Sequence, residues 1–139
     1  RDQPRSRGLG DVYKRQQDHV AAMREEYRAK RQIVLDGLAG CPVLRLIEPQ
    51  GAFYAFVDVR LTGLDSGEFA DRLLDEEHVA VVPGEAFGEE GRGFVRLSYA
   101  GDAGELREGV ARLRAFAERV WNPITGHHTA TYHPMEVLA

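Results

Sequence analysis

An arginine inside an apolar run is the first residue in this chain that could do chemistry. The segment 94–100 reads FVRLSYA, and alternation along a strand would place Phe94, Arg96 and Ser98 on one face. Both faces carry apolar side chains, so we expect Arg96 to be at least half buried. A buried guanidinium is tolerated when a planar anion takes two parallel hydrogen bonds from it. That anion can be an internal Asp or Glu or the carboxylate of a ligand, and the pattern alone favours the internal ion pair.

The glycines that precede this run are a second candidate site. Their spacing does not match GxGxxG, and no Gly-Lys-Ser/Thr follows, which argues against a nucleotide-binding loop. We expect them to make turns and close backbone contacts instead. They are Gly84, Gly88, Gly91 and Gly93.

Cysteine and histidine offer little further chemistry. Cys41 is the single cysteine, so no intrachain disulfide can form, which fits a reducing cytoplasm. We expect its side chain to be a packed or surface thiol rather than a nucleophile. His127, His128 and His133 lie near the C-terminus. Structural zinc recruits a fuller set of Cys and His ligands at defined spacings, so we expect no metal site there.

Composition limits the classes of protein to which this chain can belong. A chain of 139 residues with 43% hydrophobic and 29% charged residues can close one ordinary core. The formal net charge of −4 does not support a nucleic-acid surface or a polybasic membrane patch. We find no apolar run long enough to span a membrane and no signal peptide, and we expect a cytoplasmic protein.

The first 16 residues differ from the rest of the chain. They are polar, rich in Arg and Gly, and without a period of 3.6 or 2, so we expect residues 1–16 to be disordered. The stretch SRGLGDVYKRQ (6–16) also resembles the in-frame translation of a transposase-type sequencing adapter. We therefore expect residues 1–16 to be an adapter-derived artefact, and the natural N-terminal part of the protein to be missing.

Regular elements must position Arg96, and they begin at Gln17. A long helix should follow from helically spaced apolar residues, and strands at 43–49 and 52–59 should form an antiparallel hairpin. A capping-box spacing at Asp65 and Glu68 predicts a second helix ending near Glu77. That helix should carry Phe69, Ala70, Leu73 and Leu74 inward. The apolar positions of the first helix are Val20, Met23, Tyr27, Val34 and Leu38.

The second half of the chain continues in the same way. A short buried strand is expected at 79–83 and another at 94–100. Asp102 and Glu105 repeat the capping spacing before a helix with one apolar stripe. Residues 123–139 should form an irregular extension. The order of elements predicts an α+β fold in which helices cover an antiparallel or mixed sheet. The stripe comprises Leu106, Val110, Leu113, Ala117 and Val120.

Three segments together resemble a known family. They are EPQGAFYAFVDV (48–59), EFADRLLDEEHVAVVPGEAFGEEGRGFVRLSYA (68–100) and the closing amphipathic helix. The segments are similar to the C-terminal small domain of class I/II aminotransferases, the pyridoxal-phosphate enzymes of fold type I, closest to the aspartate-aminotransferase-like branch. The similarity covers residues 17–122 as one domain.

The resemblance implies roles for particular residues. It makes Arg96 the residue that grips the α-carboxylate of an amino-acid substrate, which reverses the preference for an internal ion pair. It also implies that Gly51, Ala52 and Phe53 line the pocket, with a core role for Phe53 left open. Phe87 and Gly88 are expected to be structural.

The resemblance also implies what this chain lacks. In the family, the lysine that binds pyridoxal phosphate and the rest of the cofactor site come from the large domain. This chain has only Lys14, in the apparent adapter, and Lys30, which we expect on a solvated helix face. The parent enzyme is thus expected to be a homodimeric aminotransferase acting on amino acids and 2-oxo acids, and this chain to be inactive. An aminotransferase-like domain of a transcription regulator, a fold-type-I lyase and a non-catalytic α+β binding module remain alternatives.

Overall fold

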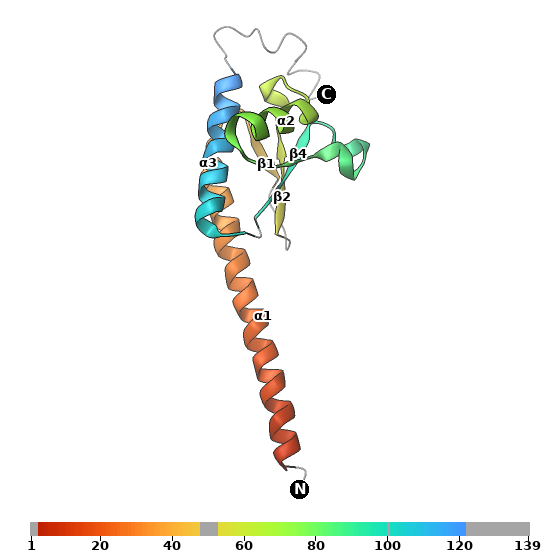
Figure 1. Ribbon diagram of the computed structural model, residues 1–139, viewed down its shortest axis with the longest axis vertical. Helices are drawn as coiled ribbons and strands as arrows, with labels where there is room; N and C mark the ends of the chain where they lie inside the picture. The colour runs from red at the N-terminus through yellow and green to blue at the C-terminus, as the bar shows by residue number, and fades with distance from the viewer. Residues whose placement is uncertain (1–2, 48–52, 100, 122–139) are drawn as a thin grey trace.

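A four-stranded sheet with helices on one face forms the body of the molecule (Figure 1). The computed structural model describes residues 3–47, 53–99 and 101–121, with side chains from Gly8 onward. All strand pairs are antiparallel, in the spatial order β1-β2-β4-β3. This confirms the predicted α+β class. The strands are β1 (Arg45–Ile47), β2 (Tyr54–Asp58), β3 (Val82–Pro83) and β4 (Phe94–Ser98).

The predicted hairpin is present, with shorter strands than expected. In β1 and β2, Leu46 lies opposite Val57, and the turn residues 48–52 lie outside the described ranges. The predicted strand 79–83 is reduced to Val82–Pro83, paired with β4. Proline has no N–H to donate, so it fits this short strand at the edge of the sheet.

One face of the sheet is apolar and covered by the three helices. Val57, Val95 and Leu97 are buried there, as strand alternation requires. The helices are α1 (Gln3–Leu38), α2 (Ser66–Glu77) and α3 (Ala103–Val120). Full burial of each large aliphatic or aromatic side chain in this core contributes about 1.5–3 kcal/mol.

Asp65 and Asp102, predicted from the capping-box spacing, are the N-caps of α2 and α3. The Asp65 carboxylate accepts the backbone N–H of Glu68 at 2.8 Å, and the Asp102 carboxylate accepts that of Glu105 at 3.1 Å. Every residue of the predicted α3 stripe is buried. In α2 the expectation for Leu74 was wrong. Its side chain is 51% exposed because the inward face is already filled by Phe69, Ala70 and Leu73.

The long helix α1 corrects the expectation for the N-terminus. Residues 3–16, predicted to be disordered, continue the helix, which projects well beyond the sheet (Figure 1). Once a helix is anchored, each added residue gains a hydrogen bond without a new nucleation cost, and Pro4 stands in the first turn, where it is tolerated. Side chains from Gly8 to Glu26 are all exposed, so Val20 and Met23 do not face the core as expected.

The C-terminal part of α1 is fixed against α3. Val34 and Leu38 join the core cluster, and Gly37 lies at a close contact between α1 and α3. A Cβ atom added to Gly37 would overlap Cγ1 of Val110, a residue that is 1% exposed. Glycine therefore sets the distance between the two helices at this point.

Replacing Gly37 should separate these helices. We expect Gly37→Ala to lower the free energy of unfolding by about 1–3 kcal/mol, as overpacking of a filled core does. The measurement is urea denaturation followed by circular dichroism. Gly109→Ala on α3 is the matched control, because a Cβ there meets nothing within 4 Å. Equal stability of the two variants would contradict this account of the helix contact.

Candidate functional site

Arg96 lies at the centre of the sheet face that the helices leave open. It stands on β4 between Phe56 of β2 and Val82 of β3. Its neighbours Val95 and Leu97 point into the core, so Arg96 points away from the helices. The residue is half-buried, as predicted from the sequence.

Aromatic rings, and not a carboxylate, surround the Arg96 guanidinium. Its Cζ lies 4.4 Å from the ring centroid of Phe87 and 4.9 Å from that of Tyr54. Within the described ranges Arg96 has no ion pair, and its Nε is buried without a hydrogen-bond partner. The internal acid favoured by the sequence pattern is thus not found in this part of the chain. A guanidinium in this position retains donors for an external anion.

The loop that carries Phe87 is built on close glycine contacts. It consists of two 3₁₀ turns, η2 (Gly84–Phe87) and η3 (Glu89–Gly91). A Cβ on Gly84 would collide with the backbone of Gly91, and the reverse is also true. Gly88 and Gly93 have φ angles of +127° and +86°. These contacts confirm the prediction of turns and close backbone approach.

Ser66 connects this loop to the rest of the fold. Its buried hydroxyl contacts the Glu85 carboxylate of η2 and accepts the backbone N–H of Gly93 at 3.3 Å. Because Ser66 is the first residue of α2, the start of that helix and the loop are held together. This link therefore holds the turn that carries Phe87 against the start of α2.

Phe53 belongs to an aromatic cluster away from Arg96. Its ring lies 5.6 Å from Tyr27 and 6.1 Å from Tyr99, both on the helix-covered side. Burial and a hydrogen bond with Tyr27 raise the pKa of Tyr99 above its ordinary value. The structure does not bring Phe53 next to Arg96, and Gly51 and Ala52 lie outside the described residues.

The other candidate groups within the described residues do not form a site. Cys41 is half-buried, with its Sγ 3.9 Å from a carboxylate oxygen of Glu118. Among the described residues, no three Cys, His, Asp or Glu side chains gather where they could hold a metal ion. His127, His128 and His133 lie outside those residues.

No helix in the described part of the chain is both long and apolar enough to cross a membrane.

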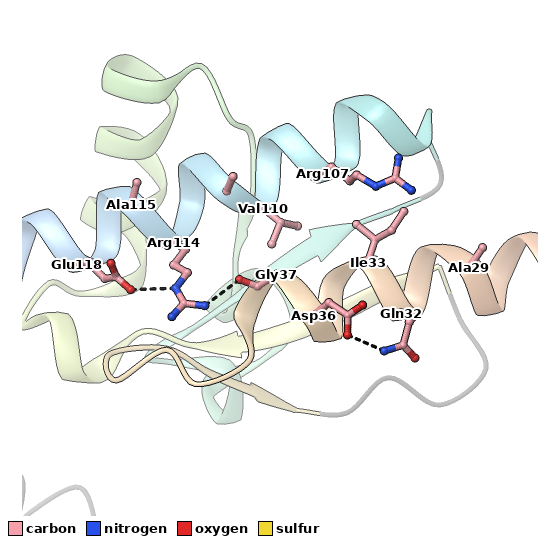
Figure 2. A pocket seen from close by; sticks show the side chains of 11 residues that line it. Ala29, Gln32, Ile33, Asp36, Gly37, Arg107, Val110, Arg114, Ala115 and Glu118 are labelled. Atoms are coloured by element: carbon pink, nitrogen blue, oxygen red, sulfur yellow. Dashed lines mark hydrogen bonds and ion pairs between the residues drawn. The ribbon is translucent and has the colours of Figure 1, made fainter.

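A groove of about 730 Å³ runs along the contact between α1 and α3 (Figure 2). Arg114 lies in it and donates to Glu118 at 2.9 Å and to the carbonyl oxygens of Gly37 and Ala39 at 3.3 and 2.8 Å. These bonds satisfy the exposed carbonyls at the end of α1. The groove lies between two packed helices, on the side of the sheet opposite Arg96.

The family of the chain follows from comparison with known proteins. The family model described as aminotransferase class I and II matches residues 5–113. The chain belongs to this aminotransferase family. The arginine–pyruvate transaminase AruH of Pseudomonas aeruginosa is 47% identical over 94 residues, which cover 68% of this chain and 24% of that protein.

Solved aminotransferase structures share the fold. An aromatic aminotransferase from Pyrococcus horikoshii is 41% identical with a TM-score of 0.71, over 76% of this chain and 28% of that one. The aspartate aminotransferase from Thermus thermophilus with maleate is 40% identical with a TM-score of 0.64, over 75% and 25%. The chain thus spans about a quarter of the length of these aminotransferases.

The lysines of this aminotransferase chain do not fit a cofactor site. Lys14 is exposed on the projecting part of α1. Lys30 is not on a solvated face as expected. Its side chain is 7% exposed, and Nζ bonds to Glu26 at 2.6 Å. It lies one turn before Val34, hence on the helix side of the sheet and away from Arg96. Neither lysine shares a site with Arg96.

Removing the Ser66 hydroxyl should loosen the loop that carries Phe87. We expect Ser66→Ala to cost about 1–3 kcal/mol, because the buried N–H of Gly93 loses its partner. Chemical denaturation measures this loss. Ser98→Ala on the exposed face is the control, with an expected change within about 0.5 kcal/mol. A Ser66→Ala protein as stable as the Ser98→Ala protein would contradict the anchoring role.

Proposed function

We propose that this chain is the C-terminal small domain of a pyridoxal-phosphate-dependent aminotransferase, and that Arg96 binds the α-carboxylate of the substrate. The observation that carries the proposal is the Arg96 guanidinium on the open face of the sheet, without an acid partner in the described ranges. Family membership and relatives named as transaminases support the reaction class. In that reaction an amino group passes from an amino acid to a 2-oxo acid.

The contribution of Arg96 would be binding and orientation. Two parallel N–H donors of a guanidinium match the two oxygens of a carboxylate. Fixing the carboxylate fixes the Cα–H bond of the substrate relative to the reacting centre, and such positioning lowers the entropic part of a barrier. Specificity for the side chain would then come from other groups, in keeping with relatives named for arginine and aromatic substrates.

Pyridoxal phosphate supplies the electron sink for this chemistry when bound. The lysines described above do not form a site for it, so the proposal places the cofactor in a large domain outside this chain. We also propose, from the family resemblance, that the parent enzyme is a cytoplasmic homodimer. Residues 1–16 would be an adapter-derived addition to the natural domain, 17–122.

A chimera tests the proposed role of Arg96. In it, residues 17–121 replace the aligned segment of the Thermus thermophilus aspartate aminotransferase. We expect transaminase activity, and we expect Arg96→Lys to lower kcat/KM by about 10- to 100-fold, the loss of a charged hydrogen bond. Arg92→Lys is the control, since the Arg92 side chain is 71% exposed. If the chimera folds, binds the cofactor and keeps its kcat/KM after Arg96→Lys, the assignment is contradicted.

The chain alone should not catalyse transamination. Mixed with pyridoxal phosphate, an amino acid and a 2-oxo acid, it should form product no faster than the free cofactor does. Chromatographic detection of the new amino acid measures this. Turnover above the cofactor-only rate would show that the catalytic lysine lies within these 139 residues.

A further inference from the structure

The two rings that contact the Arg96 guanidinium come from different parts of the chain. Tyr54 belongs to β2, which pairs with β4, whereas Phe87 ends η2. Both distances, 4.9 and 4.4 Å, lie well within the roughly 6 Å range of cation–π attraction. The guanidinium is therefore held from the sheet and from the loop at once.

A second arginine on the same sheet face provides a comparison. Arg60 also lies over an aromatic ring, that of Phe94 at 5.1 Å. Its Nε and Nη2 donate to the two carboxylate oxygens of Asp58 at 3.0 and 2.7 Å. Arg60 thus has both a ring and an acid, whereas Arg96 has rings and no acid within the described ranges.

This difference has a chemical consequence. An acid such as Asp58 accepts hydrogen bonds in the guanidinium plane and occupies the donors that a ligand carboxylate needs. A ring interacts with the cation through its π face and accepts no bidentate pair. Rings can therefore hold an arginine side chain in one place, which limits the rotamer entropy lost on binding, while its donors stay available.

Phe87 is itself held in position. Its ring packs edge-on against Phe56 with centroids 6.0 Å apart. Its loop is fixed by the contact of Gly84 with Gly91 and by the Ser66 hydroxyl. Phe87 is nevertheless 50% exposed, and Tyr54 is 45% exposed. The core does not need these two rings, which lie beside a cation that has no acid partner in the described part of the chain.

We propose that Phe87 and Tyr54 are positioning residues that hold the Arg96 guanidinium ready for a carboxylate. This inference rests on the proposed function of Arg96. It assigns Phe87, expected from the sequence to be structural only, to the binding step. Loss of either ring should weaken carboxylate binding by about two- to fivefold, the size of one partly exposed cation–π contact.

The first measurement tests the contact without any ligand. In the ¹⁵N-arginine-labelled chain, the Nε–Hε resonance of Arg96 is assigned by its loss in Arg96→Lys. We expect Phe87→Leu to move this resonance downfield as the ring current is lost, and to speed its exchange with water. Phe94→Leu is the matched control. It should move the Arg60 resonance and leave that of Arg96 in place, and an unmoved Arg60 resonance in Phe87→Leu reports an intact fold.

The second measurement adds maleate as the carboxylate probe and follows the Arg96 resonance. We expect weaker binding in Phe87→Leu and Tyr54→Leu, and affinity near that of the original chain in Phe87→Tyr, Tyr54→Phe and Phe94→Leu. Unchanged affinity in both leucine variants would overturn the positioning role, even if the resonance moved without ligand. If maleate failed to perturb Arg96 in every protein, the carboxylate role itself would be refuted, and the inference with it.

Discussion

The attraction between the Arg96 guanidinium and two aromatic rings is the interaction around which the open face of this sheet is organised. A cation that is half-buried without an acid is costly unless something else stabilises it. Tyr54 and Phe87 provide that stabilisation without occupying the in-plane donors. Arg60 differs, because its guanidinium donates to both carboxylate oxygens of Asp58.

The rest of the described fold fixes the two rings. β2 and β4 pair so that Phe56 lies opposite Arg96, which places Tyr54 within reach of the guanidinium. The helices bury the other face of the sheet and leave this one open. Glycines allow the η2 and η3 turns to pack backbone against backbone, and this compact loop carries Phe87. Stability and the candidate site thus depend on opposite faces of the same strands.

Much of this arrangement could be predicted because its causes are local. The N-caps at Asp65 and Asp102 follow from residues three apart, and the orientation of Arg96 follows from alternation within one strand. The place of Phe87 depends on a contact between Gly84 and Gly91 that no periodicity encodes. Tyr54 was missed because it reaches the Arg96 face only through the pairing of β2 with β4, two strands that are far apart in the sequence.

The errors of prediction have physical reasons that lie in packing rather than in local sequence. Lys30 has charged sequence neighbours, yet it lies one turn from Val34 and is buried with Glu26 as its partner. Leu74 fits an apolar stripe, but three other residues already fill the inward face of α2. Residues 3–16 lack an apolar period, but a helix anchored at its other end extends through them. Sequence patterns describe a face; they do not describe how much of it is filled.

The most direct test of the central claim is a crystal structure of the chimera with maleate bound. The account predicts that one maleate carboxylate accepts two hydrogen bonds from Arg96 at about 2.7–2.9 Å, with the Phe87 and Tyr54 rings still in contact with the guanidinium. Maleate bound elsewhere, with Arg96 paired to an Asp or Glu of the protein, would contradict it.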